Sequence, residues 1–159
     1  MVPMAQVNGF PGGKAWRFLA TGMGLGRLPV APGTFGSLLA LPFWFWGDGK
    51  GAVHYLSLLL LVALSIPAIR AEMRETGEPD PRTAVIDEVC GMLLAATGIP
   101  WGGFSVLCLF LLFRLFDVVK VGPAAWLNAR QGAVYVLADD LVAGIYAHLA
   151  YRGLLWLTG

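Results

Sequence analysis

Long apolar runs, separated by short polar or glycine-rich breaks, dominate the chain. Runs of this length favour helices, because half-buried strands are shorter and alternate apolar with polar residues. Two runs, "AVHYLSLLLLVALSIPAI" and "LVAGIYAHLAYRGLLWL", approach the ~20 residues that cross a bilayer core. The other apolar runs are shorter, so helices formed there must tilt, extend beyond the run or re-enter the membrane from the same side. The pattern predicts five helices, over about 34–46, 52–69, 85–98, 104–116 and 140–157.

The breaks are of two kinds. "GDGKG" and "GIPWGG" are too small to be domains and are typical of tight turns. Residues 70–82 and 120–138 carry charge, or glycine and proline, and we expect solvent-side loops there. Residues 1–15 lack the apolar core of a signal peptide, so we expect a loose N-terminal arm. Residues 16–159 are then expected to form one domain.

The composition indicates that lipid, rather than water, surrounds most of the protein. Of the 159 residues, 57% are hydrophobic and only 13% are charged. The mean hydropathy is +0.69, well above that of ordinary soluble domains. We therefore expect an all-α, polytopic membrane bundle of about five helices, some short or re-entrant. The net charge of +1 offers no basic field for nucleic acid, which we do not expect as a partner.

Basic residues are distributed asymmetrically in this topology. Threading the five segments alternately through a membrane places only Lys50 and Arg152 away from one common side. Positive charge near helix ends is retained in the cytoplasm, so the common side is expected to be cytoplasmic. The basic residues on that side are Lys14, Arg17, Arg27, Arg70, Arg74, Arg82, Arg114, Lys120 and Arg130.

Half of the ten acidic residues fall at helix ends on this same side: Asp87, Glu88, Asp117, Asp139 and Asp140. Each adjacent pair could simply begin a helix, where free N–H groups and the helix dipole favour negative charge. Carboxylates at a membrane boundary are, however, costly to desolvate. A shared cation accounts for all five together, and Mg²⁺ takes carboxylate, water and phosphate oxygens as ligands.

The segment "LLFRLFDVVK" places Arg114, Asp117 and Lys120 three residues apart, on one face of a predicted helix. A plain ladder of ion pairs is one interpretation. The other is functional: at the end of an apolar helix, the two cations could bind phosphate while Asp117 holds a metal ion.

Glycine is concentrated in "TGMGLGRLPVAPGTFGSL", residues 21–38. Such a loop can present backbone N–H groups to an anion at a helix start, with Thr34 as a hydroxyl donor, or it can be a simple re-entry loop. Two further glycines, Gly91 and Gly144, follow the acidic pairs by one helical turn and would let neighbouring helices approach closely.

Common nucleophilic enzymes would need residues that this chain lacks. His54 and His148 lie within apolar runs far from the acidic residues, and we expect them to be packed. A Cys-x5-Arg thiolate or a Ser-His-Asp arrangement does not occur at the required spacing. Water activated by a metal ion is the chemistry that remains.

Four segments in order, "TGMGLGRLPVAPGTFGSL", "DPRTAVIDEVCGML", "FRLFDVVK" and "LADDLVAGIYA", resemble the phosphatidylglycerophosphatase A family over roughly residues 21–147. The resemblance implies Mg²⁺-dependent hydrolysis of phosphatidylglycerophosphate to phosphatidylglycerol in the bacterial inner membrane. The motif residues carried over by position are Pro32, Gly33, Thr34, Asp87, Glu88, Arg114, Asp117, Lys120, Asp139 and Asp140. One departure is Val121, where the family usually has proline after the lysine; another is "RQGAVYVLADD", where the approach to the acidic pair is altered.

The mechanism implied has three parts. Four carboxylates, Asp87, Glu88, Asp117 and Asp140, are expected to form the metal shell, with Asp139 as a ligand, orienting group or base. Arg27, Arg114 and Lys120 would neutralise the phosphate, and the loop at Gly33 and Thr34 would donate hydrogen bonds. The rival hypothesis is a small transporter or channel component whose carboxylates bind cations.

Overall fold

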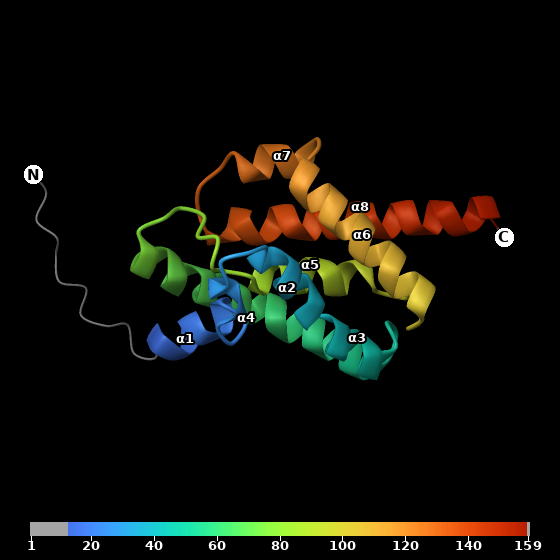
Figure 1. Ribbon diagram of the computed structural model, residues 1–159, viewed down its shortest axis with the longest axis horizontal. Coiled ribbons are helices and arrows are strands. Elements are labelled where there is room, and N and C mark those ends of the chain that lie inside the picture. Colours follow the sequence, from blue (N-terminus) through green and yellow to red (C-terminus); the bar gives the residue numbers. More distant parts are fainter. Residues whose placement is uncertain (1–12, 159) are drawn as a thin grey trace, which may run out of the picture.

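The computed structural model describes residues 13–158 and is helical throughout, without a strand in that range (Figure 1). Its elements are α1 (Gly13–Ala20), η1 (Leu25–Arg27), α2 (Pro32–Leu39), α3 (Leu41–Gly47), α4 (Ala52–Thr76), α5 (Ile86–Ala95), α6 (Gly103–Val119), α7 (Pro123–Asn128) and α8 (Ala133–Thr158). The prediction of an all-α fold is confirmed for this range.

The short helix α5 lies at the centre of the bundle. It packs against α2, α4, α6 and α8, and its residues Met92 and Leu93 are completely buried. Trp44 of α3 and Phe113 of α6 complete the same core cluster. The neighbouring helices thus bury most of α5, and the carboxylates in its first turn are positioned by a rigid core.

Two glycines allow α5 and α8 to approach closely, as the sequence predicted. A Cβ atom added to Gly144 would collide with the carbonyl oxygen of Gly91. A Cβ added to Gly91 would lie 2.6 Å from the carbonyl oxygen of Asp140 and 2.6 Å from a ring carbon of Phe113. The contact between the two helices therefore fixes the position of Asp140 relative to α5.

We expect Gly144→Ala to destabilise the protein by ~1–3 kcal/mol, because the new methyl group meets backbone that cannot move without separating two packed helices. Thermal unfolding in detergent measures this effect as a lower midpoint. Gly153→Ala on the same helix is the matched control, since a Cβ there would meet nothing within 4 Å. Equal midpoints for the two variants would contradict the close approach.

Several predicted boundaries were wrong, and prolines and ion pairs explain them. The segment 34–46 is divided into α2 and α3, with Pro42, which has no N–H to donate, in the first turn of α3. Helix α4 continues to Thr76 into the expected loop, where Arg17 of α1 pairs with Glu72 at 3.2 Å and Glu75 at 2.8 Å. The expected loop 120–138 contains α7.

The two ends of the chain also differ from expectation. Residues 1–12 of the predicted arm lie outside the described residues, whereas residues 13–15 belong to α1. Helix α8 begins at Ala133, so Asp139 and Asp140 lie in its second turn. They are therefore too far along the helix to cap it, and the capping interpretation fails for this pair. Asp87 and Glu88 do lie in the first turn of α5.

Two helices, α4 and α8, are long and apolar enough to cross a membrane. Their outer faces carry exposed apolar side chains such as Leu59, Leu60 and Leu149. The molecule thus has an apolar exterior suited to lipid.

The histidines are packed as expected: His54 is buried against Thr97 at 3.1 Å, and His148 lies 3.0 Å from the Ala95 carbonyl.

Candidate active site

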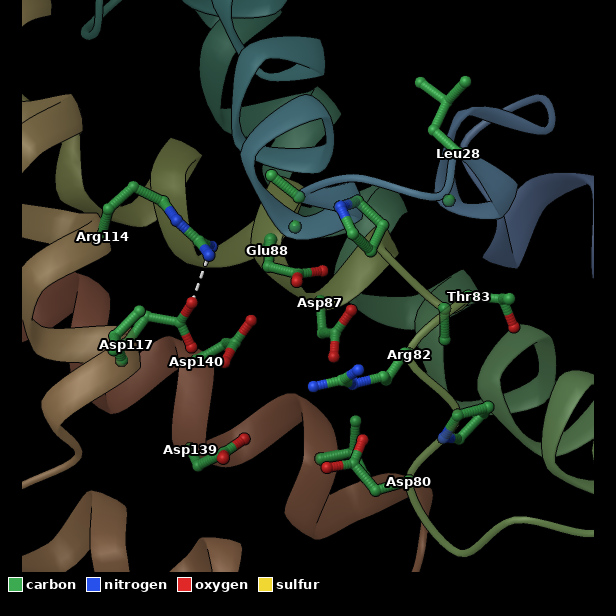
Figure 2. Close-up of a pocket in the computed structure, with 18 of the residues that line it drawn as sticks. Leu28, Asp80, Arg82, Thr83, Asp87, Glu88, Arg114, Asp117, Asp139 and Asp140 are labelled. Atoms are coloured by element: carbon green, nitrogen blue, oxygen red, sulfur yellow. Dashed lines mark ion pairs between the residues drawn. The ribbon is translucent and has the colours of Figure 1, made fainter.

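Five carboxylates from three helices converge on one pocket of about 580 Å³ (Figure 2). The first turn of α5 supplies Asp87 and Glu88, the last turn of α6 supplies Asp117, and the second turn of α8 supplies Asp139 and Asp140. All except Glu88 are buried, and Glu88 is half-buried. The structure therefore brings together every acidic residue that the sequence analysis selected.

Three of these residues form a tight group. Single oxygens of Asp87, Glu88 and Asp140 all lie within 4.8 Å of one another. One oxygen of each, Asp87 Oδ1, Glu88 Oε2 and Asp140 Oδ2, is buried without a hydrogen-bond partner among the described residues. Unpartnered buried carboxylate oxygens at such separations are suitable ligands for a hard divalent cation.

The environment of the group opposes its own ionisation. Burial, together with the neighbouring Glu88, raises the pKa of Asp87 well above its ordinary value. Burial and the charge of Asp140 raise the pKa of Glu88 to about 8. Desolvation and like charge both disfavour the carboxylate form, and a bound cation reverses both effects. The residues therefore fit a divalent ion.

The other two carboxylates are paired with cations. Lys120 Nζ lies 2.6 Å from Asp139 Oδ2, 3.1 Å from Asp117 Oδ1 and 3.4 Å from Asp140 Oδ1. Burial lowers the pKa of Lys120, but the carboxylates of Asp140, Asp139 and Asp117 outweigh it and raise the pKa above its usual value. The second oxygen of Asp117 lies 2.6 Å from Arg114 Nη1. Asp117 thus lies outside the three-carboxylate group and contacts the two cations of its own helix face.

The beginning of α2 forms the wall opposite α8. Pro32 and Gly33 line the pocket, and a Cβ on Gly33 would collide with Glu88 Oε1 and lie 3.0 Å from Arg114 Nη1. Glycine at position 33 therefore leaves room for both side chains. Thr34 is not among the residues that line the pocket, and its amide donates to the Ala31 carbonyl at 3.0 Å.

Two charged residues of the pocket were not selected from the sequence. Asp80 and Arg82 lie in the connection between α4 and α5, and the Arg82 side chain extends between Asp87 and Asp139 in Figure 2. The sequence feature that could have identified them is their position in "DPR", five to seven residues before Asp87. Arg27, which the sequence did select, lines the same pocket from η1.

Comparison with known proteins assigns the family. The model of the family described as phosphatidylglycerophosphatase A matches residues 18–155. The chain belongs to the phosphatidylglycerophosphatase A family. The match includes α2, α5, α6 and α8, which supply the pocket, so the resemblance found in four short motifs extends over nearly the whole chain.

Curated relatives agree with this family. The chain is 30% identical over 152 residues to phosphatidylglycerophosphatase A of Escherichia coli K12, covering 91% of this chain and 83% of the relative. It is 28% identical over 144 residues to phosphatidylglycerophosphatase A of Haemophilus influenzae, covering 81% and 82%. It is also 31% identical over 150 residues to a Bacteroides thetaiotaomicron protein named "Putative phosphatidylinositol-3-phosphatase", covering 89% and 94%.

No solved structure matches the chain. The family and the names of the relatives make this chain a phosphatase. Lipid phosphate esters are common to all three relatives' names, which agrees with the apolar exterior of the molecule.

Proposed function

We propose that this protein is a Mg²⁺-dependent phosphatase that hydrolyses phosphatidylglycerophosphate to phosphatidylglycerol at the cytoplasmic face of a bacterial inner membrane. One observation carries the proposal: three carboxylates with unpartnered buried oxygens lie in the same pocket as the guanidinium of Arg114, which Asp117 holds at 2.6 Å. Carboxylate oxygens without partners beside a guanidinium group suit a metal ion and a phosphate together.

Asp87, Glu88 and Asp140 would hold the ion. When bound, Mg²⁺ supplies Lewis-acid chemistry, polarising phosphoryl oxygens and lowering the pKa of a water molecule. Six carboxylates line the pocket against four basic side chains, namely Arg27, Arg82, Arg114 and Lys120. In their ionised form these carboxylates would outnumber the cations and repel a phosphomonoester unless a bound cation offset them. The acidity of the pocket thus supports the requirement for metal.

The basic residues would bind the phosphate from two sides. Arg114 reaches the pocket from α6 beside Gly33, and Arg82 reaches it from the connection before α5 (Figure 2). Arginine matches phosphate oxygens with paired N–H donors. Charge spreads over the equatorial oxygens in the transition state of phosphoryl transfer, so the guanidinium of Arg114, which Asp117 holds at 2.6 Å, would stabilise it.

Asp117 and Asp139 would act through the cations that they hold. Asp139 fixes Lys120 at 2.6 Å, and Asp117 joins Lys120 to Arg114. These contacts restrict the two side chains before substrate arrives, which lowers the entropic cost of binding. A water oxygen would then form the new bond to phosphorus, while the bond to the glycerol oxygen breaks and that oxygen takes a proton.

The membrane placement rests on the charge distribution. The pocket and most basic residues lie at the end of the bundle where α4 ends and α5 and α8 begin. Lys50 lies in the connection between α3 and α4, and Arg152 lies near the end of α8; this connection and the C-terminal end of α8 are at the opposite end in Figure 1. The positive-inside rule favours a cytoplasmic position for the pocket. A transporter would place ionisable groups near the midplane, and this end position favours chemistry at the lipid headgroups instead.

The proposed substrate is tested with purified protein in detergent and three lipids: phosphatidylglycerophosphate, phosphatidylinositol-3-phosphate and phosphatidate. Inorganic phosphate is measured with Mg²⁺ present. We expect phosphatidylglycerophosphate to have the highest kcat/KM. A higher value for the inositol lipid would overturn the proposed substrate while leaving the phosphatase class intact.

We expect Arg82→Gln to raise the KM for phosphatidylglycerophosphate about tenfold with a smaller change in kcat. A charge-assisted hydrogen bond contributes ~1.5–3 kcal/mol, and an interaction made equally before and during reaction appears in KM. Steady-state kinetics in mixed micelles measure both constants. Arg152→Gln, at the opposite end of the bundle and bonded to the Gly98 carbonyl, is the matched control and should leave both constants unchanged.

A further inference from the structure

An apolar groove opens on the surface beside the active site. It has a volume of about 310 Å³ and is bounded by α1, the α1–η1 turn, α2, α3, α4 and α5 through side chains that include Phe18, Met23, Leu39, Phe43, Leu61 and Ile86. Every lining residue is apolar or glycine. Phe18 and Met23 are 58% and 63% exposed, so the groove is open to the surroundings of the protein.

A small basic pocket lies between the groove and the active site. Its lining includes Lys14, Arg17 and Arg27. Glu72 and Glu75 pair with Arg17, whereas Lys14 and Arg27 have no ion pair within the described part of the chain. The pocket therefore retains positive charge that a phosphodiester would complement.

Shared residues make the three hollows adjacent to one another. Arg27 lines both the active-site pocket and the basic pocket, and Phe18 lines both the basic pocket and the groove. From the active site to the groove, the lining therefore changes from carboxylates and arginines to basic residues without carboxylates, and then to apolar side chains. A phospholipid with a terminal phosphate has the same order of chemistry, from phosphomonoester through phosphodiester to acyl chain.

The two faces of α5 connect the groove to the catalytic groups. Asp87 and Glu88 line the active-site pocket, whereas Ile86 and Val89, on either side of them in sequence, line the groove. Leu39 and Phe43 continue the groove along α2 and α3, away from the end where the carboxylates lie. A chain in the groove would therefore extend from the headgroup end toward the bundle's apolar middle.

We propose that this groove holds one acyl chain of the phospholipid whose headgroup occupies the active-site pocket. The inference rests on the proposed lipid phosphatase function and adds a binding site for the hydrocarbon part of the substrate. A long acyl chain in the groove makes van der Waals contacts with its lining that a short-chain analogue cannot make, so the groove gives long-chain lipids an advantage.

The test compares long-chain phosphatidylglycerophosphate with its water-soluble dibutyroyl analogue. Leu61→Trp fills the groove from α4, and Leu59→Trp is the matched control, because Leu59 is 68% exposed on the same helix and does not line the groove. We expect Leu61→Trp to lower the long-chain to short-chain ratio of kcat/KM about tenfold (~1.4 kcal/mol). The control should keep the wild-type ratio.

A second variant and a binding measurement keep the test decisive. If Leu61→Trp does not fold, Leu39→Phe fills the groove from α2. The same fall in the long-chain to short-chain ratio of kcat/KM is then expected of Leu39→Phe. A phosphatidylglycerol probe with a photoreactive acyl chain should label Phe43 or Met23, as located by mass spectrometry. Lipid adducts confined to residues outside the groove would overturn the proposal.

The outcomes separate the two proposals. An unchanged kcat/KM ratio in both groove variants, with no lipid adducts in the groove, would overturn the acyl-chain site while normal phosphate release preserves the proposed function. Adducts in the groove, with no phosphate released from either lipid, would support the acyl-chain site and overturn the proposed function.

Discussion

Phosphate release from phosphatidylglycerophosphate is expected to stop when Mg²⁺ is removed with a chelator and to resume when Mg²⁺ is returned. Asp87, Glu88 and Asp140 present three buried oxygens without hydrogen-bond partners, and the pKa of Glu88 is about 8 because of burial and the Asp140 charge. Without a cation, the carboxylate form of this group is disfavoured, and any ionised carboxylate would repel an incoming phosphate. We expect a loss of at least ~10³-fold, since such electrostatic stabilisation is often the largest catalytic contribution.

A second measurement separates metal binding from catalysis. An ion that binds only the folded protein at a hundred times its Kd stabilises that protein by ~2.7 kcal/mol. We therefore expect Mg²⁺ to raise the thermal midpoint of the wild-type protein in the absence of lipid. Full turnover in the presence of excess chelator, together with an unchanged midpoint, would exclude the metal mechanism.

Asp140→Asn should lower kcat by several orders of magnitude while the protein still folds. The substitution preserves side-chain size but removes a charge from the three-carboxylate group, whose oxygens lie within 4.8 Å. It also weakens the longest of the Lys120 contacts, at 3.4 Å, and leaves the contacts at 2.6 and 3.1 Å in place. Loss of repulsion among the carboxylates offsets the weakened ion pair, so the thermal unfolding midpoint measured without Mg²⁺ should not fall.

The control for this variant is Asp48→Asn at the opposite end of the bundle. Asp48 accepts a hydrogen bond from the Trp101 amide at 2.7 Å, and asparagine retains an oxygen for it. We expect wild-type turnover and a normal stabilisation by Mg²⁺ in this control, and neither in Asp140→Asn. Near-normal turnover of Asp140→Asn would show that the buried carboxylates have a structural role only.

Contacts within one helix were predictable from spacing alone. Residues three apart on a helix lie on one face, and Arg114, Asp117 and Lys120 do form the expected ladder, at 2.6 and 3.1 Å. The two alternative interpretations, ion-pair ladder and phosphate site, were both drawn from this spacing. The structure adds Asp139 as the nearest partner of Lys120, which no local pattern could indicate.

Helix boundaries were predictable where apolar runs meet breakers, and failed where polar residues continue a helix. The apolar pattern ends near residue 69, but α4 continues to Thr76, because Arg17 of a distant helix pairs with Glu72 and Glu75. The early start of α8 likewise moved Asp139 and Asp140 from a predicted helix start into its second turn.

The sequence by itself determined the all-helical class, the two long apolar helices, the close approach at Gly91 and Gly144, and the set of carboxylates, because these depend on composition and on spacing along single helices. Only the tertiary structure decided which carboxylates share unpartnered oxygens and which are paired with cations. It also brought Arg82 into the pocket, left Thr34 out of it, and placed an apolar groove beside it. These features depend on how segments far apart in the chain pack, and packing is set by the shape of the whole core rather than by any local pattern.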